Sequence, residues 1–190
     1  MSDLKLNIQW SFIRSVEGFK SEGYVPQDRS TGVQSGVTIG AGFDIGQHSV
    51  EQLKAFHFTP LLFSKLEMFA GITGLHAFHL LSRQRLSLTD EELEELEVKV
   101  HEKYARQIEK EYNENSCFNF NELSAEQQTV IASVGFQYGS LKKRCPKFFK
   151  AVVEADWQRA IDILNDFKDD YAVRRKKEAK LLSTSIPYIS

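Results

Sequence analysis

The sequence has few of the residues that would cross-link the chain or anchor it in a membrane. Only two of its 190 residues are cysteine, Cys117 and Cys145, and their spacing is neither a CxxC pair nor a metal-ligand pattern. No run approaches the roughly 20 apolar residues that a membrane-spanning helix requires. The first ten residues, MSDLKLNIQW, also lack the basic and apolar regions of a signal peptide. We therefore expect free thiols in a soluble protein made in the cytoplasm, with no membrane insertion.

The chain also lacks an excess of charge of either sign. Its formal net charge is -2, which gives no overall field that would attract nucleic acid. His76 and His79 have helical spacing but no third ligand nearby, so we expect no metal site. The 42% apolar and 26% charged residues are typical of a globular protein with a substantial core. One domain, with two lobes at most, suits this length.

Helical patterns dominate, with one exception near the N-terminus. Residues 23–46 are rich in Gly, Pro, Ser and Thr around short alternating runs, which predicts a small sheet. Ser49 with Gln52, and Thr89 with Glu92, form capping-box patterns at helix starts. The predicted helices cover about 5–21, 59–71, 73–82, 89–113, 124–139, 146–155 and 157–182, the last with a break near Asp169, and a further short helix begins at Ser49. This order predicts an α+β fold, mainly helical with a small N-terminal sheet.

Residues 36–47, GVTIGAGFDIGQ, combine a strand-like alternation with four glycines. Thr38 and Asp44 fall on one face, but six residues of straight strand would separate them by about 20 Å. If they act together, the chain must turn between them, and Gly40 and Gly42 supply the freedom to do so. The alternatives are a plain glycine-rich hairpin or a dinucleotide-binding turn. The second lacks the right glycine spacing and the acidic residue after a second strand.

Glu17 continues an apolar stripe instead of lying opposite it. Leu6, Trp10 and Ile13 precede it at steps of four and three residues, so the carboxyl should be partly buried near a helix C-terminus. Both burial and the negative end of the helix dipole raise the pKa of a carboxyl group, which suits a general acid. The alternative is a structural ion pair with an Arg or Lys.

These motifs together resemble the phage-type lysozymes. The resemblance comprises Glu-Gly at the end of the first helix, a Tyr soon after it, Thr-Ile-Gly-x-Gly in a small sheet, then IASVGFQYGSL, FFKAVVEADWQRAIDIL and YAVRRKKEAKLL. Within that superfamily, SGVTIGAGFDIGQ is most similar to the pesticin-like muramidases, a group found in bacteriocins, secreted antibacterial effectors and phage endolysins. The resemblance implies a single lysozyme-like catalytic domain over residues 1–190. Its small lobe would cover about 20–50 and its helical lobe about 85–190, with the first helix packed on the latter.

Carried over by position, the resemblance implies Glu17 as general acid, with Thr38 and Asp44 positioning the attacking water. Asp28 is the alternative second carboxylate, because the older phage pattern places its aspartate between the Glu and the Thr. The resemblance also implies that Gln137 lines the substrate cleft. Either Arg174 or Arg175 would pair with Glu17, and the motif leaves the choice open.

The implied activity is that of an inverting muramidase. It would cleave the β-1,4 bond between N-acetylmuramic acid and N-acetylglucosamine in the glycan strands of peptidoglycan, without a metal or an organic cofactor. We expect a monomer that acts in the periplasm or cell wall after export, injection or lysis, with a cognate immunity protein as a further partner. The alternative is a catalytically silent lysozyme-like module that binds peptidoglycan or a protein.

Overall fold

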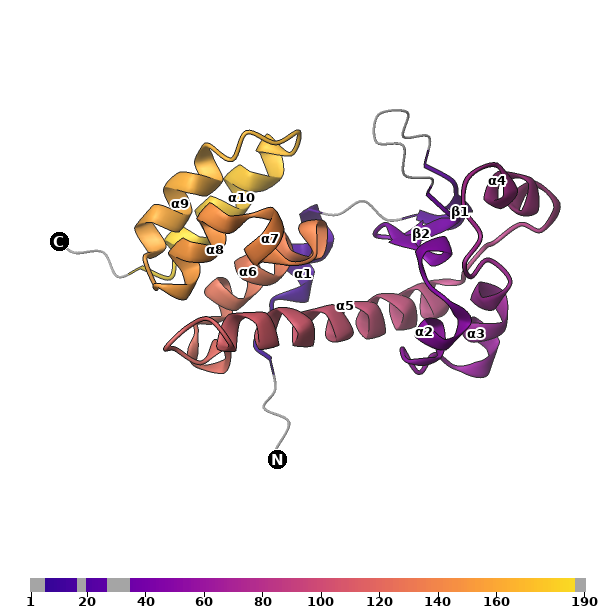
Figure 1. The fold of residues 1–190 in the computed structure, drawn as a ribbon, viewed down its shortest axis with the longest axis horizontal. Helices are drawn as coiled ribbons and strands as arrows, with labels where there is room; N and C mark the ends of the chain where they lie inside the picture. The colour runs from indigo at the N-terminus through magenta and orange to yellow at the C-terminus, as the bar shows by residue number, and fades with distance from the viewer. Residues whose placement is uncertain (1–5, 17–19, 27–34, 187–190) are drawn as a thin grey trace. The chain divides into compact units, whose positions relative to one another are not determined.

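The structure, a computed structural model, describes residues 6–16, 20–26 and 35–186 (Figure 1). The chain divides into two compact units, one made of residues 1–16 and 104–190 and the other of residues 17–103. The division falls inside the long helix α5 (Asp90–Asn113), so each unit contains one part of this helix. Most of the described chain is helical, and it contains one small antiparallel sheet, which confirms the predicted α+β class.

The sheet lies in the unit of residues 17–103 and has three antiparallel strands in the order β1-β2-β3. They are β1 (Lys20–Tyr24), β2 (Thr38–Gly40) and β3 (Phe43–Asp44), followed by the 3-10 turn η1 (Ile45–Gln47). The alternating residues Val37, Ile39 and Ile45 are fully buried. This agrees with the apolar face that the sequence pattern indicated, because successive strand residues point to opposite faces.

The described part of this unit also contains three short helices and the start of α5. They are α2 (Val50–Lys54), α3 (Pro60–Glu67) and α4 (Gly74–Arg83). Ser49 caps α2 in a reciprocal capping box with Gln52, and Thr59 caps α3 just before Pro60. The rings of Phe56 and Phe58 stack at 5.3 Å in the core. These helix starts are where their local capping chemistry predicted them.

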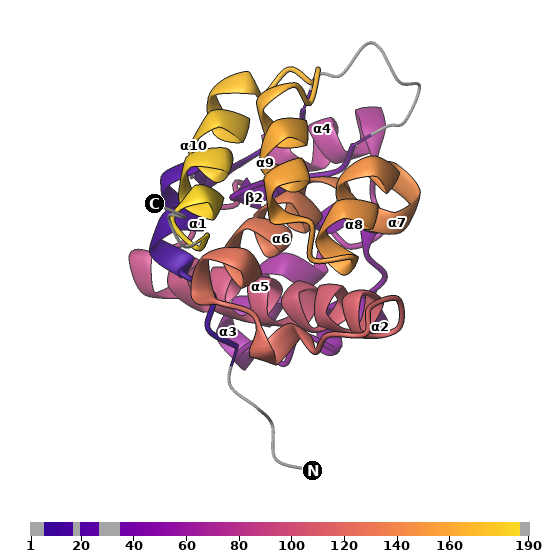
Figure 2. The ribbon, with the colours of Figure 1, turned by 90° about the vertical axis from the view of Figure 1, so that its left-hand side faces the viewer.

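The other unit is a bundle of helices. It contains α1 (Trp10–Val16), the end of α5, the 3-10 turn η2 (Phe120–Glu122), α6 (Ala125–Tyr138), α7 (Leu141–Arg144), α8 (Pro146–Val153), α9 (Trp157–Asn165) and α10 (Ala172–Ser183). Helices α9 and α10 lie side by side, and α10 also packs on α6 (Figure 2). Residues 128–135 of α6 are all buried, so this helix forms the centre of the unit.

The predicted first helix is shorter than expected. The helical pattern extended over about 5–21, but α1 covers only Trp10–Val16, and Lys20 begins strand β1. The backbone N–H groups of Asn7 and Gln9 donate at 2.8 Å to the side chains of Gln128 and Thr129 on α6. These bonds replace the helical bonds that the periodicity suggested. Helix α7, of only four residues, was also missed because it is too short to show a period.

None of the helices in the described part of the chain is both long and apolar enough to span a bilayer.

Candidate active site

Thr38 and Asp44 lie directly opposite each other on β2 and β3. Residues that face each other on neighbouring strands point to the same side of the sheet, with β-carbons about 5 Å apart. The chain turns between them through Gly40 and Gly42, whose φ angles are +63° and +103°. Other residues rarely adopt these angles. The expectation that the chain must turn to bring Thr38 and Asp44 together is confirmed.

The carboxylate of Asp44 is held by backbone N–H groups on two sides. Oδ1 accepts from Gly36 N and Gly46 N, both at 3.0 Å, and Oδ2 shares the Gly36 donor at 3.1 Å. The bonds from Gly36 N join β3 to the segment before β2, and the bond from Gly46 N caps the turn η1. This arrangement fixes the orientation of the carboxylate and leaves Oδ2 with acceptor capacity for another donor.

Gly36 and Gly46 can both donate to Asp44 because their backbones lie very close together. We call this pair of donors the Asp44 clamp. A β-carbon on Gly36 would lie 2.4 Å from the Cα of Gly46, and one on Gly46 would lie 2.3 Å from the carbonyl oxygen of Ile72. No side chain fits at either position without a shift of the backbone. The spacing of glycines in GVTIGAGFDIGQ therefore has a structural cause at both ends of the motif.

Thr38 is buried between its neighbours, with 3% of its surface exposed. Its hydroxyl donates to the carbonyl oxygen of Gly36 at 3.3 Å, so the lone pairs of Oγ1 remain able to accept. So little exposed surface can contact a water molecule but not a whole sugar ring. The threonine and the adjacent carboxylate thus offer two acceptors on one side of the sheet.

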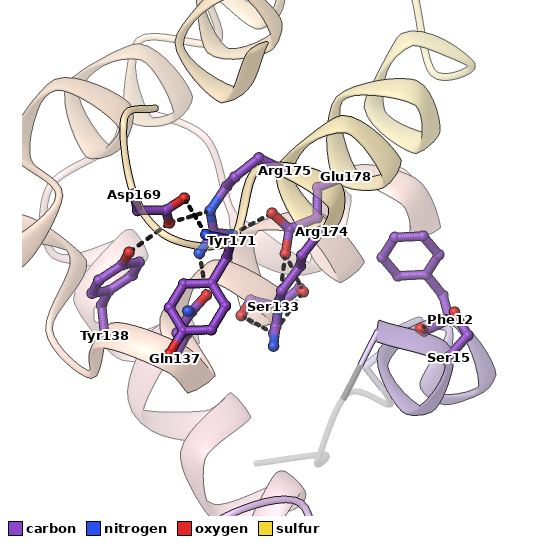
Figure 3. A network of polar contacts seen from close by, with 10 residues as sticks. All are labelled: Phe12, Ser15, Ser133, Gln137, Tyr138, Asp169, Tyr171, Arg174, Arg175 and Glu178. Atoms are coloured by element: carbon purple, nitrogen blue, oxygen red, sulfur yellow. Dashed lines mark hydrogen bonds and ion pairs between the residues drawn. The ribbon is translucent and has the colours of Figure 1, made fainter. Parts of the chain in front are cut away.

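The other unit contains a buried network of charged groups around Arg175 (Figure 3). The Arg175 side chain is 1% exposed, and its guanidinium forms ion pairs with Asp169, at 2.9 Å, and with Glu178. It also donates to the side-chain oxygen of Gln137 and lies over the rings of Tyr138 and Phe167, at 5.4 and 4.6 Å from their centroids. Arg175 is therefore enclosed on several sides by α6, α10 and the segment between α9 and α10.

Arg174 extends from the same turn of α10 toward α6 (Figure 3). Its Nε donates to Glu178 at 3.1 Å, and its Nη2 donates to the carbonyl oxygen of Ser133 at 2.8 Å. Glu178 is fully buried and also accepts from the Ser133 hydroxyl at 2.5 Å. One carboxylate thus holds both arginines, which fits the high cost of burying a charge without a partner.

Asp169 joins Arg175 to Tyr138. The Tyr138 hydroxyl donates to Asp169 at 2.6 Å. Burial acts to raise the pKa of Asp169, but the hydrogen bonds from Tyr138, Arg175 and the Tyr171 amide outweigh it and lower the pKa below its usual value. Burial, and next the bond to Asp169, raise the pKa of Tyr138 to about 12. The phenol therefore remains a donor and the carboxylate remains ionised at neutral pH.

A pocket of about 340 Å³ lies in this unit, between the end of α1 and the start of α10. Its lining consists of Ser15, Val16, residues 170–174 and Lys177. Arg174 and Lys177 bring two positive charges to the pocket and Asp170 brings one negative charge.

The sequence-predicted residues therefore divide into three groups. Thr38 and Asp44 come together in one unit, and Gln137, Arg174 and Arg175 come together in the other. Glu17 and Asp28 lie outside the residues that the structure describes. Within the described ranges, no three His, Cys, Asp or Glu side chains gather in a group that could hold a metal ion.

Sequence reasoning missed Ser133, Asp169 and Glu178. Glu178 lies three and four residues after the two arginines, which is the spacing of neighbours on one helix face. That spacing was the available sequence signal. Ser133 and Asp169 contact the arginines from other elements, and no local pattern marks them.

A mainly helical chain with a small sheet that carries a Thr-Asp pair has the architecture of a lysozyme-like protein. Residues 7–158 match the family described as "Pesticin: Bacterial toxin homologue of phage lysozyme, C-term". The chain belongs to this family, as the resemblance of its motifs implied. No curated protein matches it. The family indicates a muramidase type of peptidoglycan hydrolase.

Proposed function

We propose that the protein is a muramidase that hydrolyses the β-1,4 bond between N-acetylmuramic acid and N-acetylglucosamine. The observation that carries this proposal is the pairing of Thr38 with Asp44 across β2 and β3, with the carboxylate clamped by Gly36 and Gly46. The contacts that cap η1 and join β3 to the segment before β2 also hold Oδ2 in a fixed position beside the Thr38 hydroxyl, where a water molecule could donate to both. Membership of the family supports the substrate class.

Glu17 is the proposed general acid. It would protonate the leaving oxygen of the glycosidic bond, while a water molecule donates its two hydrogens to Asp44 Oδ2 and Thr38 Oγ1. The water then attacks the anomeric carbon with a lone pair, and its proton passes to Asp44. Because the water occupies the space in front of the second carboxylate, we propose inversion of configuration. Proton NMR of the first product should detect the α-anomer, and a β-anomer would contradict the proposal.

Arg174 is the arginine that we propose to act at the site, either against Glu17 or against the glycan. Arg174 lines the pocket between the end of α1 and the start of α10. Arg175, in contrast, is enclosed by Asp169, Glu178 and Gln137. In this proposal, Arg175 holds Gln137 and the start of α10 in position and does not contact the substrate.

The proposed partner is the glycan strand of peptidoglycan, which the enzyme would reach in the periplasm or cell wall. The chemistry needs two carboxyl groups and a water molecule, so it requires neither a metal nor an organic cofactor. An antibacterial or endolysin role, and a cognate immunity protein, are part of the same proposal. We propose that the enzyme acts as a monomer.

The test is release of reducing ends from purified peptidoglycan by the wild-type chain and by Glu17→Gln. The amide is nearly isosteric but cannot donate the proton, so turnover should fall by about 10²- to 10⁴-fold. Glu114→Gln is the matched control, because the Glu114 side chain, just after the end of α5, is 61% exposed in an ion pair with Lys110. Circular dichroism should be the same for all three proteins. Near wild-type turnover by a folded Glu17→Gln protein would contradict the assignment, and binding without cleavage by the wild type would contradict the enzyme.

A further inference from the structure

Tyr24 lies in the same row of the sheet as the proposed water-binding pair. On β1 it faces Thr38 of β2, and Thr38 in turn faces Asp44 of β3. Facing residues of antiparallel strands share one side of the sheet, so the three side chains stand next to one another, one from each strand. The Tyr24 and Asp44 side chains are half-buried, whereas Thr38 between them is buried.

We propose that Tyr24 is a substrate-contacting residue whose hydroxyl donates a hydrogen bond to an oxygen of the sugar bound beside Thr38 and Asp44. This inference rests on the muramidase function proposed above. The water in that mechanism is served by the other two residues of the row, so the sugar is the remaining acceptor on this side of the sheet. Pyranose hydroxyls, ring oxygens and N-acetyl carbonyls are all acceptors for a phenol.

The environment of Tyr24 suits a donor that stays neutral. Burial raises the pKa of the phenol, and the negative charge of Asp44 raises it further. The hydroxyl therefore keeps its proton over the neutral pH range. The ammonium group of Lys20 lies 3.8 Å from the centre of the Tyr24 ring and covers one ring face. This contact restrains the ring, so the hydroxyl at its edge is the group that remains for a ligand.

Tyr24→Phe removes the hydroxyl and keeps the ring, and we compare it with Tyr112→Phe. The Tyr112 hydroxyl donates to the carbonyl oxygen of Val152 at 3.3 Å in the core of the other unit, so its loss should lower thermal stability without changing turnover. Tyr24→Phe should lower turnover and leave thermal stability unchanged. We expect kcat/KM on purified peptidoglycan to fall by about 3- to 10-fold, the value of one neutral hydrogen bond, with Tm unchanged.

A second measurement separates this inference from the proposed function. Retention on insoluble peptidoglycan is compared for Glu17→Gln and for Glu17→Gln combined with Tyr24→Phe, so that the substrate persists. Weaker retention of the double variant supports the contact, even if the wild type released no reducing ends and the muramidase proposal failed. The proposed Tyr24 contact would be overturned by equal retention of the two proteins or by no retention of either. It would also be overturned if Tyr24→Phe left kcat/KM unchanged in an active enzyme. A loss of activity that merely follows a fall in Tm would assign Tyr24 to structure alone.

Discussion

Arg175 and Glu178 form an ion pair within one turn of α10, and both side chains are closed off from solvent. Burying two charges costs several kcal/mol for each, and the pair compensates only if every remaining donor and acceptor also finds a partner. Asp169 and Gln137 complete the shell of Arg175, while Arg174 and Ser133 complete that of Glu178. The network therefore fixes the start of α10 against α6, and Arg174 projects from this fixed turn.

Glu178→Gln should destabilise the fold strongly although the volume of the side chain is preserved. It leaves Arg175 with one carboxylate instead of two, and breaking a buried pair costs about 3–5 kcal/mol. We expect a loss of about 3 kcal/mol in the free energy of unfolding, measured by urea titration. Glu114→Gln breaks an exposed pair between Lys110 on α5 and Glu114 just after it, in which the side chains are 77% and 61% exposed. It should change the free energy of unfolding by less than about 0.5 kcal/mol. Equal effects of the two substitutions would show that the buried pair adds no stability.

Asp169 makes the fold sensitive to acid. Burial acts against ionisation, but the bonds from Tyr138 and Arg175 lower the pKa of this carboxyl in the folded chain. A lowered folded-state pKa adds stability above the unfolded value of about 3.9. That stability is lost as pH falls through the folded value. The free energy of unfolding of the wild type should therefore decline below about pH 4.

The matching variant is Asp169→Asn, which should be less stable at pH 7 and should show a shallower decline below pH 4. Asp166→Asn is the control, because the Asp166 side chain is 74% exposed. Urea unfolding between pH 7 and pH 2.5 measures both slopes. Identical slopes for Asp169→Asn and the wild type would mean that Asp169 does not contribute to acid sensitivity.

Helix starts were predictable because their chemistry is local. Thr89 and Glu92 exchange two hydrogen bonds at 2.9 and 3.3 Å, as their spacing indicated. Ser124, the predicted start of the next helix, forms the same reciprocal pair with Gln127. The segment of residues 6–9 was not predictable, because its amide donors bond to α6, more than 110 residues away. Periodicity describes one element at a time and carries no information about such distant partners.

The candidate site also has features that the local sequence indicated and features that it did not. The sequence allowed the approach of Thr38 to Asp44, because the glycines between them permit a turn that other residues rarely favour. The enclosure of Arg175 did not follow, because it depends on Asp169, Gln137 and two aromatic rings from separate segments. Two adjacent arginines look equivalent in sequence, and the tertiary contacts give them different surroundings.

Gly46→Ala should disrupt the Asp44 clamp. The new methyl group would meet backbone atoms, the carbonyl oxygen of Ile72 at 2.3 Å and the Cα of Gly36 at 2.6 Å, and backbone cannot move aside as a flexible side chain can. Overpacking typically costs about 1–3 kcal/mol, and we expect about 3 here. Turnover per folded molecule should also fall, because the Gly36 and Gly46 donors hold Asp44.

Gly71→Ala is the matched control for this substitution. Gly71 has φ +69° with nothing within 4 Å, so its substitution should cost about 1–2 kcal/mol of backbone strain and leave turnover unchanged. Thermal unfolding together with the reducing-end assay separates the two effects. If Gly46→Ala kept both full stability and full turnover, the close approach of Gly46 to Gly36 and Ile72 would contribute to neither property.

Asp44→Asn and Thr38→Val test whether the two residues serve one water molecule. Asparagine can still accept from Gly36 and Gly46 through its carbonyl oxygen, so the cap of η1 should survive while the acceptor at Oδ2 becomes a donor. We expect Asp44→Asn to lower kcat by about 10²-fold or more, with Tm little changed. Thr38→Val keeps the volume of a buried side chain and should lower kcat to a smaller extent.

The double variant should lose less than the product of the two single losses, because once one acceptor is gone the water is no longer held for the other to act on. Asp28→Asn completes the set, since Asp28 is the other candidate for the second carboxylate, and it should be comparatively mild. Multiplicative losses would mean that Thr38 and Asp44 act independently. A severe loss in Asp28→Asn beside an active Asp44→Asn would transfer the role of second carboxylate to Asp28 and leave Asp44 as the cap that joins β3 to the segment before β2.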